Sequence, residues 1–133
     1  MKVSALYEGS YSVDNSKKFI PFDLAVHNPK DRPASLFIYV QPFIVKTDQD
    51  LIVLDTGLGY TDENNKLILH ENIRKAGYDP DDVTLVLMSH LHYDHSGGIV
   101  FNNNDWLELS FPNAEYIVQH AEWEMAYSKP SRS

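Results

Sequence analysis

A short apolar run leads directly into a cluster of potential metal ligands. The run is residues 83–88, VTLVLM, and the cluster that follows it is His90-x-His92-x-Asp94-His95. Because the run is apolar on both faces, it predicts a central β-strand that is buried on both sides. The ligand cluster then lies at the carboxyl end of this strand.

Further strands and helices are predicted on both sides of this run. The predicted strands are residues 3–7, 36–46, 51–54, 83–88 and 116–118, and the predicted helices are residues 67–76 and 120–127. Pro42 cannot donate to a strand ladder, so an edge position or a bulge is expected there. Loops are predicted elsewhere, including residues 8–35, 47–50, 102–105 and 128–133. This mixture places the fold in the α/β or α+β class.

The ligand cluster packs three imidazoles and one carboxylate into six residues. Imidazole nitrogens and carboxylate oxygens suit zinc and related divalent ions. Alternate side chains of an extended segment share one side, so His90 and His92 can bind one ion together. Small residues 96–98 allow the chain to turn sharply next to Asp94 and His95, so that these two side chains can face the same cavity and hold a second ion. A lone histidine is usually a packing or surface residue, but four ligands so close together predict a metal site.

The motif resembles the signature of the metallo-β-lactamase-fold hydrolases. Leu54-Asp55-Thr56-Gly57 resembles the family's earlier strand-end motif, and residues 36–127 are similar throughout to the N-terminal half of that fold. The resemblance implies an αββα sandwich with the metals at one edge of its two sheets. Residues 1–133 are then expected to form a single domain that is incomplete, because it contains only the N-terminal half of the sandwich.

The resemblance also implies roles for individual residues. His90 and His92 would bind the first of two divalent ions, and Asp94 and His95 the second, with Asp55 supporting them from behind. Zinc is the first choice of metal, with iron or manganese as alternatives. Asp94 would also orient the nucleophile and take part in proton transfer. In the family, a third histidine and a bridging aspartate come from the C-terminal half. The only histidine after the motif is His120, which is expected to be a surface or packing residue.

Two flanking segments look most like the quorum-quenching lactonase group. They are residues 77–82, GYDPDD, and residues 118–124, VQHAEWE. This similarity implies a metal-dependent hydrolase in which a metal-bound hydroxide attacks the carbonyl of a lactone or related ester. The alternatives are a glyoxalase II-like thioesterase and an inactive metal-binding fragment that needs a C-terminal half. Phosphodiesterase activity ranks lower because the chain is acidic.

Composition restricts the partners. The formal net charge of −8 repels phosphate backbones, so no nucleic-acid partner is expected. The chain has no cysteine, which excludes thiolate metal sites. A signal peptide and a membrane span are not apparent either, so a cytoplasmic protein without membrane association is expected. The expected partners are a small-molecule ester or lactone and either a C-terminal half of the fold or further copies of this chain.

Overall fold

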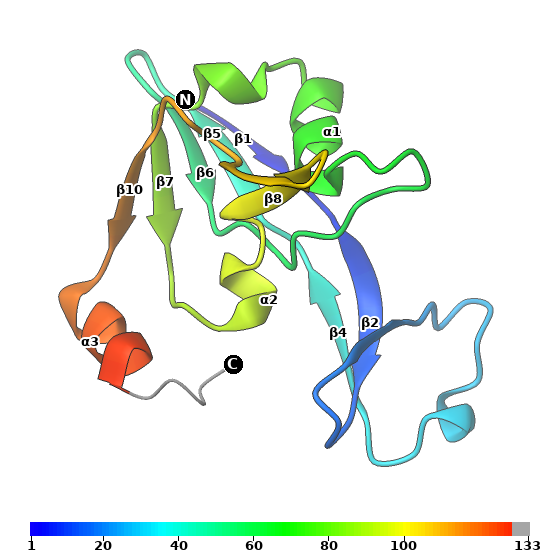
Figure 1. Ribbon diagram of the computed structural model, residues 1–133. Coiled ribbons are helices and arrows are strands. Elements are labelled where there is room, and N and C mark those ends of the chain that lie inside the picture. Colours follow the sequence, from blue (N-terminus) through cyan, green and yellow to red (C-terminus); the bar gives the residue numbers. More distant parts are fainter. Residues whose placement is uncertain (129–133) are drawn as a thin grey trace.

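The computed structural model describes residues 1–128, with side chains through residue 124. Its centre is a mixed five-stranded sheet in the order β1-β5-β6-β7-β10 (Figure 1). The strands are β1 (Lys2–Ala5), β5 (Phe43–Lys46), β6 (Leu51–Leu54), β7 (Leu85–Met88) and β10 (Glu115–Val118). β7 pairs in parallel with both neighbours, whereas β5 is antiparallel to β1 and β6. The predicted α/β (α+β) class is therefore confirmed.

A smaller sheet continues from the large one where two segments of the chain are interrupted, between β1 and β2 and between β4 and β5. Its strands are β2 (Gly9–Val13), β3 (Phe19–Pro21) and β4 (Leu36–Val40), in the order β3-β2-β4. At the break, the Leu6 amide donates to the Pro42 carbonyl over 2.7 Å, and the Glu8 amide donates to Val40 over 2.9 Å. These two hydrogen bonds connect the segments where one sheet ends and the other begins, which we call the corner between the sheets. Glu8 therefore lies close to the ends of both sheets.

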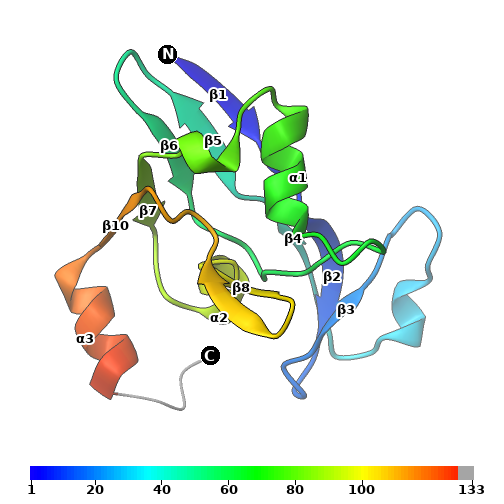
Figure 2. The same cartoon turned by 45° about the horizontal axis from the view of Figure 1, so that its top comes forward.

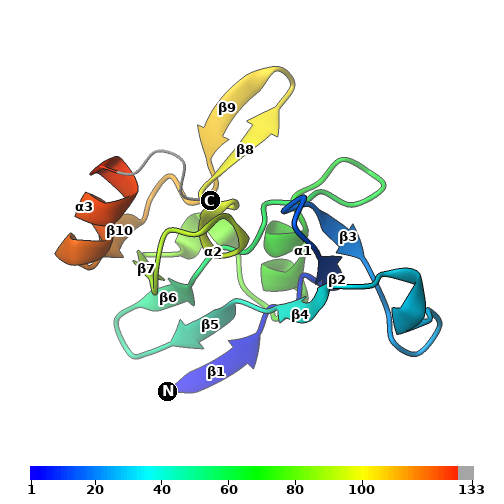
Figure 3. The ribbon, with the colours of Figure 1, turned by 90° about the horizontal axis from the view of Figure 1, so that it is seen from below.

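Helices are short and few in the described part of the chain. They are α1 (Ile68–Lys75), α2 (Tyr93–Ser96) and α3 (His120–Ser128), together with the 3-10 turns η1 (Pro29–Asp31) and η2 (Pro80–Asp82). Figures 2 and 3 show α1 and α2 on the same side of the large sheet. No helix in the described part of the chain is both long and apolar enough to cross a bilayer.

The main core lies between α1 and one face of the large sheet. Leu69 and Ile73 of α1 are fully buried and belong to the same cluster as Ile44, Val53 and Val86 of the strands. Full burial of one such aliphatic side chain stabilises the fold by about 1.5–3 kcal/mol. This cluster therefore fixes the positions of β6 and β7, whose carboxyl ends carry the candidate site.

The opposite face of the large sheet is apolar and is not covered by any described helix or strand (Figure 3). We call it the open face. Strand register places its side chains in two rows across the sheet, which include Val3, Phe43, Val45, Ile52, Leu54, Leu85, Leu87 and Ile117. They range from half-buried to 56% exposed for Val3. β7 is thus central as predicted, but only its Val86 face is fully buried.

Three parts of the sequence prediction are wrong. Residues 8–35 were expected to be loop but contain β2, β3 and η1, because serine and glycine alternate there with buried Tyr11 and disguise a strand. The expected strand 36–46 is two strands in different sheets, separated at Pro42. The loop expected at 102–105 is correct only for Asn104 and Asp105, which turn with positive φ, and the two strands that flank this turn were not predicted, β8 (Val100–Asn103) and β9 (Trp106–Leu109). The predicted terminal loop lies outside the described residues from position 129 onward.

His70 makes the fold sensitive to acid. Its Nε2 is 2.7 Å from the Ser110 carbonyl oxygen, and its ring packs edge-on against Phe101 and Phe111. Burial lowers the pKa of His70, although the hydrogen bond to Ser110 acts in the opposite direction. The unfolded chain therefore binds this proton more tightly, so the stabilisation is complete above the unfolded pKa and is lost as the pH falls through the folded pKa.

We expect the His70→Gln variant to lose less unfolding free energy than the wild type between about pH 7.5 and about pH 5.5, because glutamine has no proton to gain. Urea unfolding at both pH values measures the difference. The other titrating groups are shared by the two proteins, so parallel pH curves would show that His70 is not the sensitive group.

Candidate metal centre

The motif folds into a tight turn immediately after β7. His92 is extended, with φ −64° and ψ 151°, and caps the amino end of α2, which spans only Tyr93–Ser96. The Ser96 hydroxyl shares its hydrogen between the carbonyls of Leu91 and His92. This bifurcated hydrogen bond joins the two ends of the turn and stabilises it. This turn folds the second half of the motif back toward His90.

Three of the predicted ligands converge. One donor atom from each of His90, Asp94 and His95 lies within 4.8 Å of the other two. The His90 and His95 ring centroids are 4.0 Å apart, and His95 Nε2 is 3.5 Å from Asp94 Oδ2. His92 lies beside this group with its ring centroid 4.7 Å from that of His90, but it is not one of the three convergent residues.

Asp55 orients the His95 ring through Nδ1, the nitrogen that does not face Asp94. His95 Nδ1 donates to Asp55 Oδ2 over 2.8 Å, and this contact leaves Nε2 on the side of Asp94. A carboxylate that accepts from one ring nitrogen fixes the tautomer and raises the basicity of the other nitrogen. Asp55 reaches this position because it ends β6 with a left-handed backbone, φ 63°, beside the end of parallel β7.

Ser89 extends the same support to His90. Its backbone amide donates to Asp55 Oδ1 over 2.7 Å, and its hydroxyl donates to Oδ2 over 2.6 Å. The same hydroxyl oxygen is 3.0 Å from His90 Nδ1. With its hydrogen committed to Asp55, the hydroxyl accepts from Nδ1, and the His90 Nε2 lone pair is left free. One carboxylate therefore sets the orientation of two histidines.

Titratable groups of the site are shifted from their ordinary pKa values. The hydrogen bond with Asp55 raises the pKa of His95 against the effect of burial. Burial lowers the pKa of His90, and His95 and His92 lower it further. Burial opposes ionisation of Asp55, but the hydrogen bonds from His95 and Ser89 outweigh it and lower the pKa of Asp55. At neutral pH, Asp55 is thus ionised and His90 neutral.

The convergent donor set suits a divalent cation. Two imidazole nitrogens and one carboxylate oxygen are ligands that zinc accepts, and a catalytic zinc site uses three protein ligands and one open position. A hydrogen-bonded carboxylate behind a ligand histidine is also usual in such centres. The residues present therefore fit the metal that the motif predicts.

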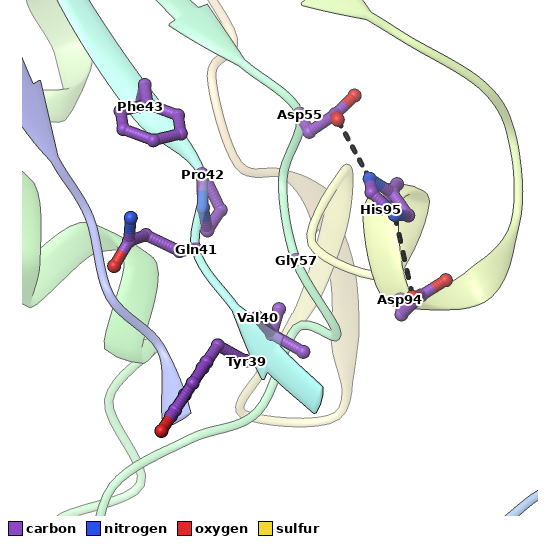
Figure 4. Close-up of a pocket in the computed structure, with 9 residues that line it drawn as sticks. All are labelled: Tyr39, Val40, Gln41, Pro42, Phe43, Asp55, Gly57, Asp94 and His95. Carbon is purple, nitrogen blue, oxygen red and sulfur yellow. Dashed lines mark hydrogen bonds and ion pairs between the residues drawn. The ribbon is translucent and has the colours of Figure 1, made fainter. Parts of the chain in front are cut away.

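A cavity of about 290 Å³ lies against the centre. Figure 4 shows Asp55, Asp94 and His95 on one side of it and the β4–β5 connection on the other. Its lining is Tyr39, Val40, Gln41, Pro42, Phe43, Asp55, Gly57, Asp94 and His95. The volume is close to the lower end for small-molecule pockets. Polar side chains, among them Gln41, Asp55, Asp94 and His95, make up a larger share of the lining than is usual for such pockets.

Several supporting residues were not predicted from the sequence. Ser89 directly precedes the ligand motif, and Thr56, whose hydroxyl donates to the His95 carbonyl, lies within the earlier strand-end motif, so their positions could have indicated a supporting role. Glu122 of α3 accepts from the Leu91 amide over 2.8 Å, but no local pattern marks this contact. His120 is highly exposed and lies 2.9 Å from Glu124, away from the convergent group.

The family profile described as the metallo-beta-lactamase superfamily matches residues 37–125, about two thirds of the chain. The chain belongs to this superfamily. The match covers every element from β4 to most of α3, including both strand-end motifs. The resemblance and the half-sandwich fold that it implied are therefore confirmed.

Relatives within the superfamily include lactonases. An N-acyl homoserine lactonase of Bacillus thuringiensis is 27% identical over an alignment of 103 residues. The match covers 63% of this chain and 38% of the relative. The lactonase AttM of Agrobacterium fabrum is 43% identical over 58 residues, or 44% of this chain and 19% of the relative. The chain thus spans well under half the length of these curated relatives.

Solved structures of this superfamily have the same fold. AidC, a dizinc quorum-quenching lactonase in complex with a product, is 29% identical with a TM-score of 0.66, and the overlap covers 92% of this chain and 43% of AidC. The hydrolase AbOPH is 26% identical with a TM-score of 0.65 over the same shares. In both cases this chain corresponds to less than half of the solved protein.

The Asp55→Asn variant should bind divalent metal about tenfold more weakly, because loss of an oriented carboxylate behind a ligand histidine typically costs about 10–100-fold. Asparagine tolerates the left-handed backbone at this position, so the change removes mainly the charge. Cobalt(II) titration by visible absorption measures the affinity, with Asp48→Asn in the β5–β6 turn as the matched control. Equal affinities for the two variants would argue against the orienting role.

Proposed function

We propose that this chain is the metal-binding half of a metal-dependent hydrolase whose complete form opens a lactone ring. The observation that carries the proposal is the convergence of His90, Asp94 and His95, with Asp55 orienting the histidines directly and through Ser89. The lactonases of Bacillus thuringiensis and Agrobacterium fabrum support the choice of substrate class.

We assign His90, His92, Asp94 and His95 as the ligands that this chain supplies to two divalent ions, with zinc as the first choice. AidC is a dizinc enzyme, which supports both the number and the element. Iron and manganese accept the same ligand types, so elemental analysis of the purified protein decides between them. His92 enters the assignment because its ring lies directly against that of His90.

The chain's own residues prepare a site for attack on a carbonyl. When bound, divalent ions of this kind lower the pKa of water and polarise a carbonyl oxygen. Asp55 holds the histidine rings so that little reorganisation is needed when the substrate arrives. Asp94 lines the cavity together with His95 (Figure 4). Its carboxylate takes the proton of the attacking water and returns it to the ring oxygen that leaves, which yields the hydroxy acid.

A C-terminal half of the same fold would complete the domain by covering the open face. An apolar sheet face of this size is unusual on a finished protein surface and marks an interaction site. AidC, of which this chain covers 43%, supports a second half of similar size as the occupant rather than a further copy of this chain. Light scattering of the isolated chain tests whether the open face needs to be covered, since a monodisperse monomer at high concentration would contradict this. Loss of the self-association when a separately expressed C-terminal half is added would support that half as the occupant.

An inactive metal-binding fragment is the second candidate for the chain on its own. The convergent group contains only three residues of the described chain, and a two-metal centre needs more ligands than these. The isolated chain would then bind metal weakly and hydrolyse nothing, whereas the complete protein would be active.

Substrate assays on the complete protein test the function. The three substrates are an N-acyl homoserine lactone, a glutathione thioester and a bis-phosphodiester, each with metal content measured in the same sample. We expect lactone turnover that depends on bound metal. Thioester turnover without lactone turnover would indicate a glyoxalase II-like enzyme, and no turnover of the lactone by metal-loaded protein would overturn the proposal.

A further inference from the structure

Glu8 is a buried acidic residue that the proposed chemistry does not use. Glu8 is 7% exposed at the corner between the two sheets, and burial raises its pKa, although hydrogen bonds from backbone amides lower it. Its oxygens accept hydrogen bonds from two backbone amides, Leu58 over 2.8 Å and Gly59 over 3.2 Å. A buried carboxylate is costly unless its oxygens are hydrogen-bonded, so these hydrogen bonds stabilise the Glu8 carboxylate at this position.

The amides belong to the segment that follows β6. We call residues 55–59 the strand-end loop. The loop has left-handed backbone at Asp55, Gly57 and Gly59, with φ of 63°, 71° and 80°. The glycines adopt this conformation freely and leave the loop many alternatives, whereas Asp55 adopts it when surrounding contacts fix it. Glu8 supplies such contacts at the far end of the loop.

The near end of the strand-end loop holds the metal-binding turn. The Thr56 amide and hydroxyl both donate to the His95 carbonyl, over 2.7 Å and 2.9 Å. Backbones of the two segments also touch, because a Cβ on Gly98 would lie 2.2 Å from the Thr56 oxygen, and one on Gly59 would lie 2.3 Å from the Gly97 oxygen. A displacement of the loop therefore moves His95.

We propose that Glu8 is a positioning residue of the metal centre. It anchors the strand-end loop through Leu58 and Gly59, and the loop in turn holds His95 through Asp55 and Thr56. This inference rests on the proposed function, because it takes His95 to be a metal ligand. Glu8 itself touches neither the proposed metal nor the substrate cavity.

Cobalt(II) titration of the complete protein tests the role of Glu8. The Glu8→Gln variant keeps the shape of the side chain but places an amide hydrogen against a backbone donor. We expect about tenfold weaker cobalt binding, at the low end of the effect of groups that orient metal ligands, together with a changed visible absorption spectrum. Glu8→Asp, which is too short to reach both amides, should show a loss in the same direction.

The Ile73→Val variant separates positioning from general stability. Ile73 is fully buried in α1, so this change lowers the melting temperature without touching the loop, and cobalt affinity should stay at the wild-type value. If the wild type itself binds no cobalt, the proposed metal centre is wrong. If the wild type binds and Glu8→Gln binds equally well with the same spectrum, the positioning role is wrong.

Hydrogen exchange in the wild-type protein provides a test that needs no variant. The Leu58 and Gly59 amides should exchange as slowly as those of β6, because Glu8 holds them away from water. Rapid exchange of both amides would show that Glu8 does not anchor the strand-end loop, whether or not the Glu8 variants fold.

Discussion

The Asp94→Ala variant should lose divalent metal affinity by more than about a hundredfold, since loss of a group behind a ligand already costs about 10–100-fold. Asp94 contributes the carboxylate of the convergent group, and its Oδ2 is 3.5 Å from His95 Nε2. Without it, the group retains two imidazoles and loses the anionic donor that offsets the charge of the cation. Zinc competition against a coloured chelator measures the loss.

The matched control is Asp48→Ala. Asp48 is exposed in the turn between β5 and β6, at the opposite end of β6 from Asp55, and its removal changes the net charge by the same amount. We expect wild-type zinc affinity for this variant. If both variants weaken binding equally, the effect of Asp94 is one of overall charge and not of coordination.

The Gly97→Ala variant should have the largest effect on stability, a loss of about 3 kcal/mol in unfolding free energy, at the upper end for overpacking. An added Cβ would lie 2.2 Å from the Leu58 oxygen and 2.7 Å from the Tyr93 ring. The hydrogen bonds of Thr56 and Glu8 hold the strand-end loop in place. The Leu58 carbonyl therefore cannot easily move away from the added methyl group. Urea denaturation measures the change.

Gly77→Ala distinguishes this clash from the ordinary cost of replacing a glycine. Gly77 follows α1 with φ +94° and has nothing within 4 Å of an added Cβ, so the substitution should cost about 1–2 kcal/mol from its left-handed backbone alone. Gly97 has φ −60°, which alanine adopts freely. A Gly97→Ala variant no less stable than Gly77→Ala would contradict the close packing of the two loops.

The sequence was most informative where local pattern and chemistry coincide. The apolar run before the motif predicted β7, the predicted helix 67–76 matches α1 to within a residue at each end, and the predicted 47–50 loop connects β5 and β6, because each depends on neighbouring residues. The prediction that Asp55 supports the ligands came from a resemblance. The structure adds the reason for its position, which is that β6 and β7 are parallel neighbours whose ends lie together.

Contacts between distant residues were out of reach of such reasoning. Glu8 meets Leu58 across 50 positions of the chain, and nothing in the residues around Glu8 indicates a buried carboxylate. β2 was missed because its serines and glycine resemble loop composition, although Tyr11 and Ser12 are buried. The grouping of His90 with Asp94 and His95 depends on the pitch of the α2 turn, which the spacing of the motif does not specify.

Anomalous diffraction at the zinc edge, from crystals of the zinc-loaded protein, tests the metal centre most directly. We predict zinc peaks for two ions at this turn, with donor atoms of His90, Asp94 and His95 at about 2.0–2.2 Å from an ion, as in other zinc sites. A map with no peak among these three side chains, or with zinc held only by exposed residues such as His27 or His120, would contradict the account.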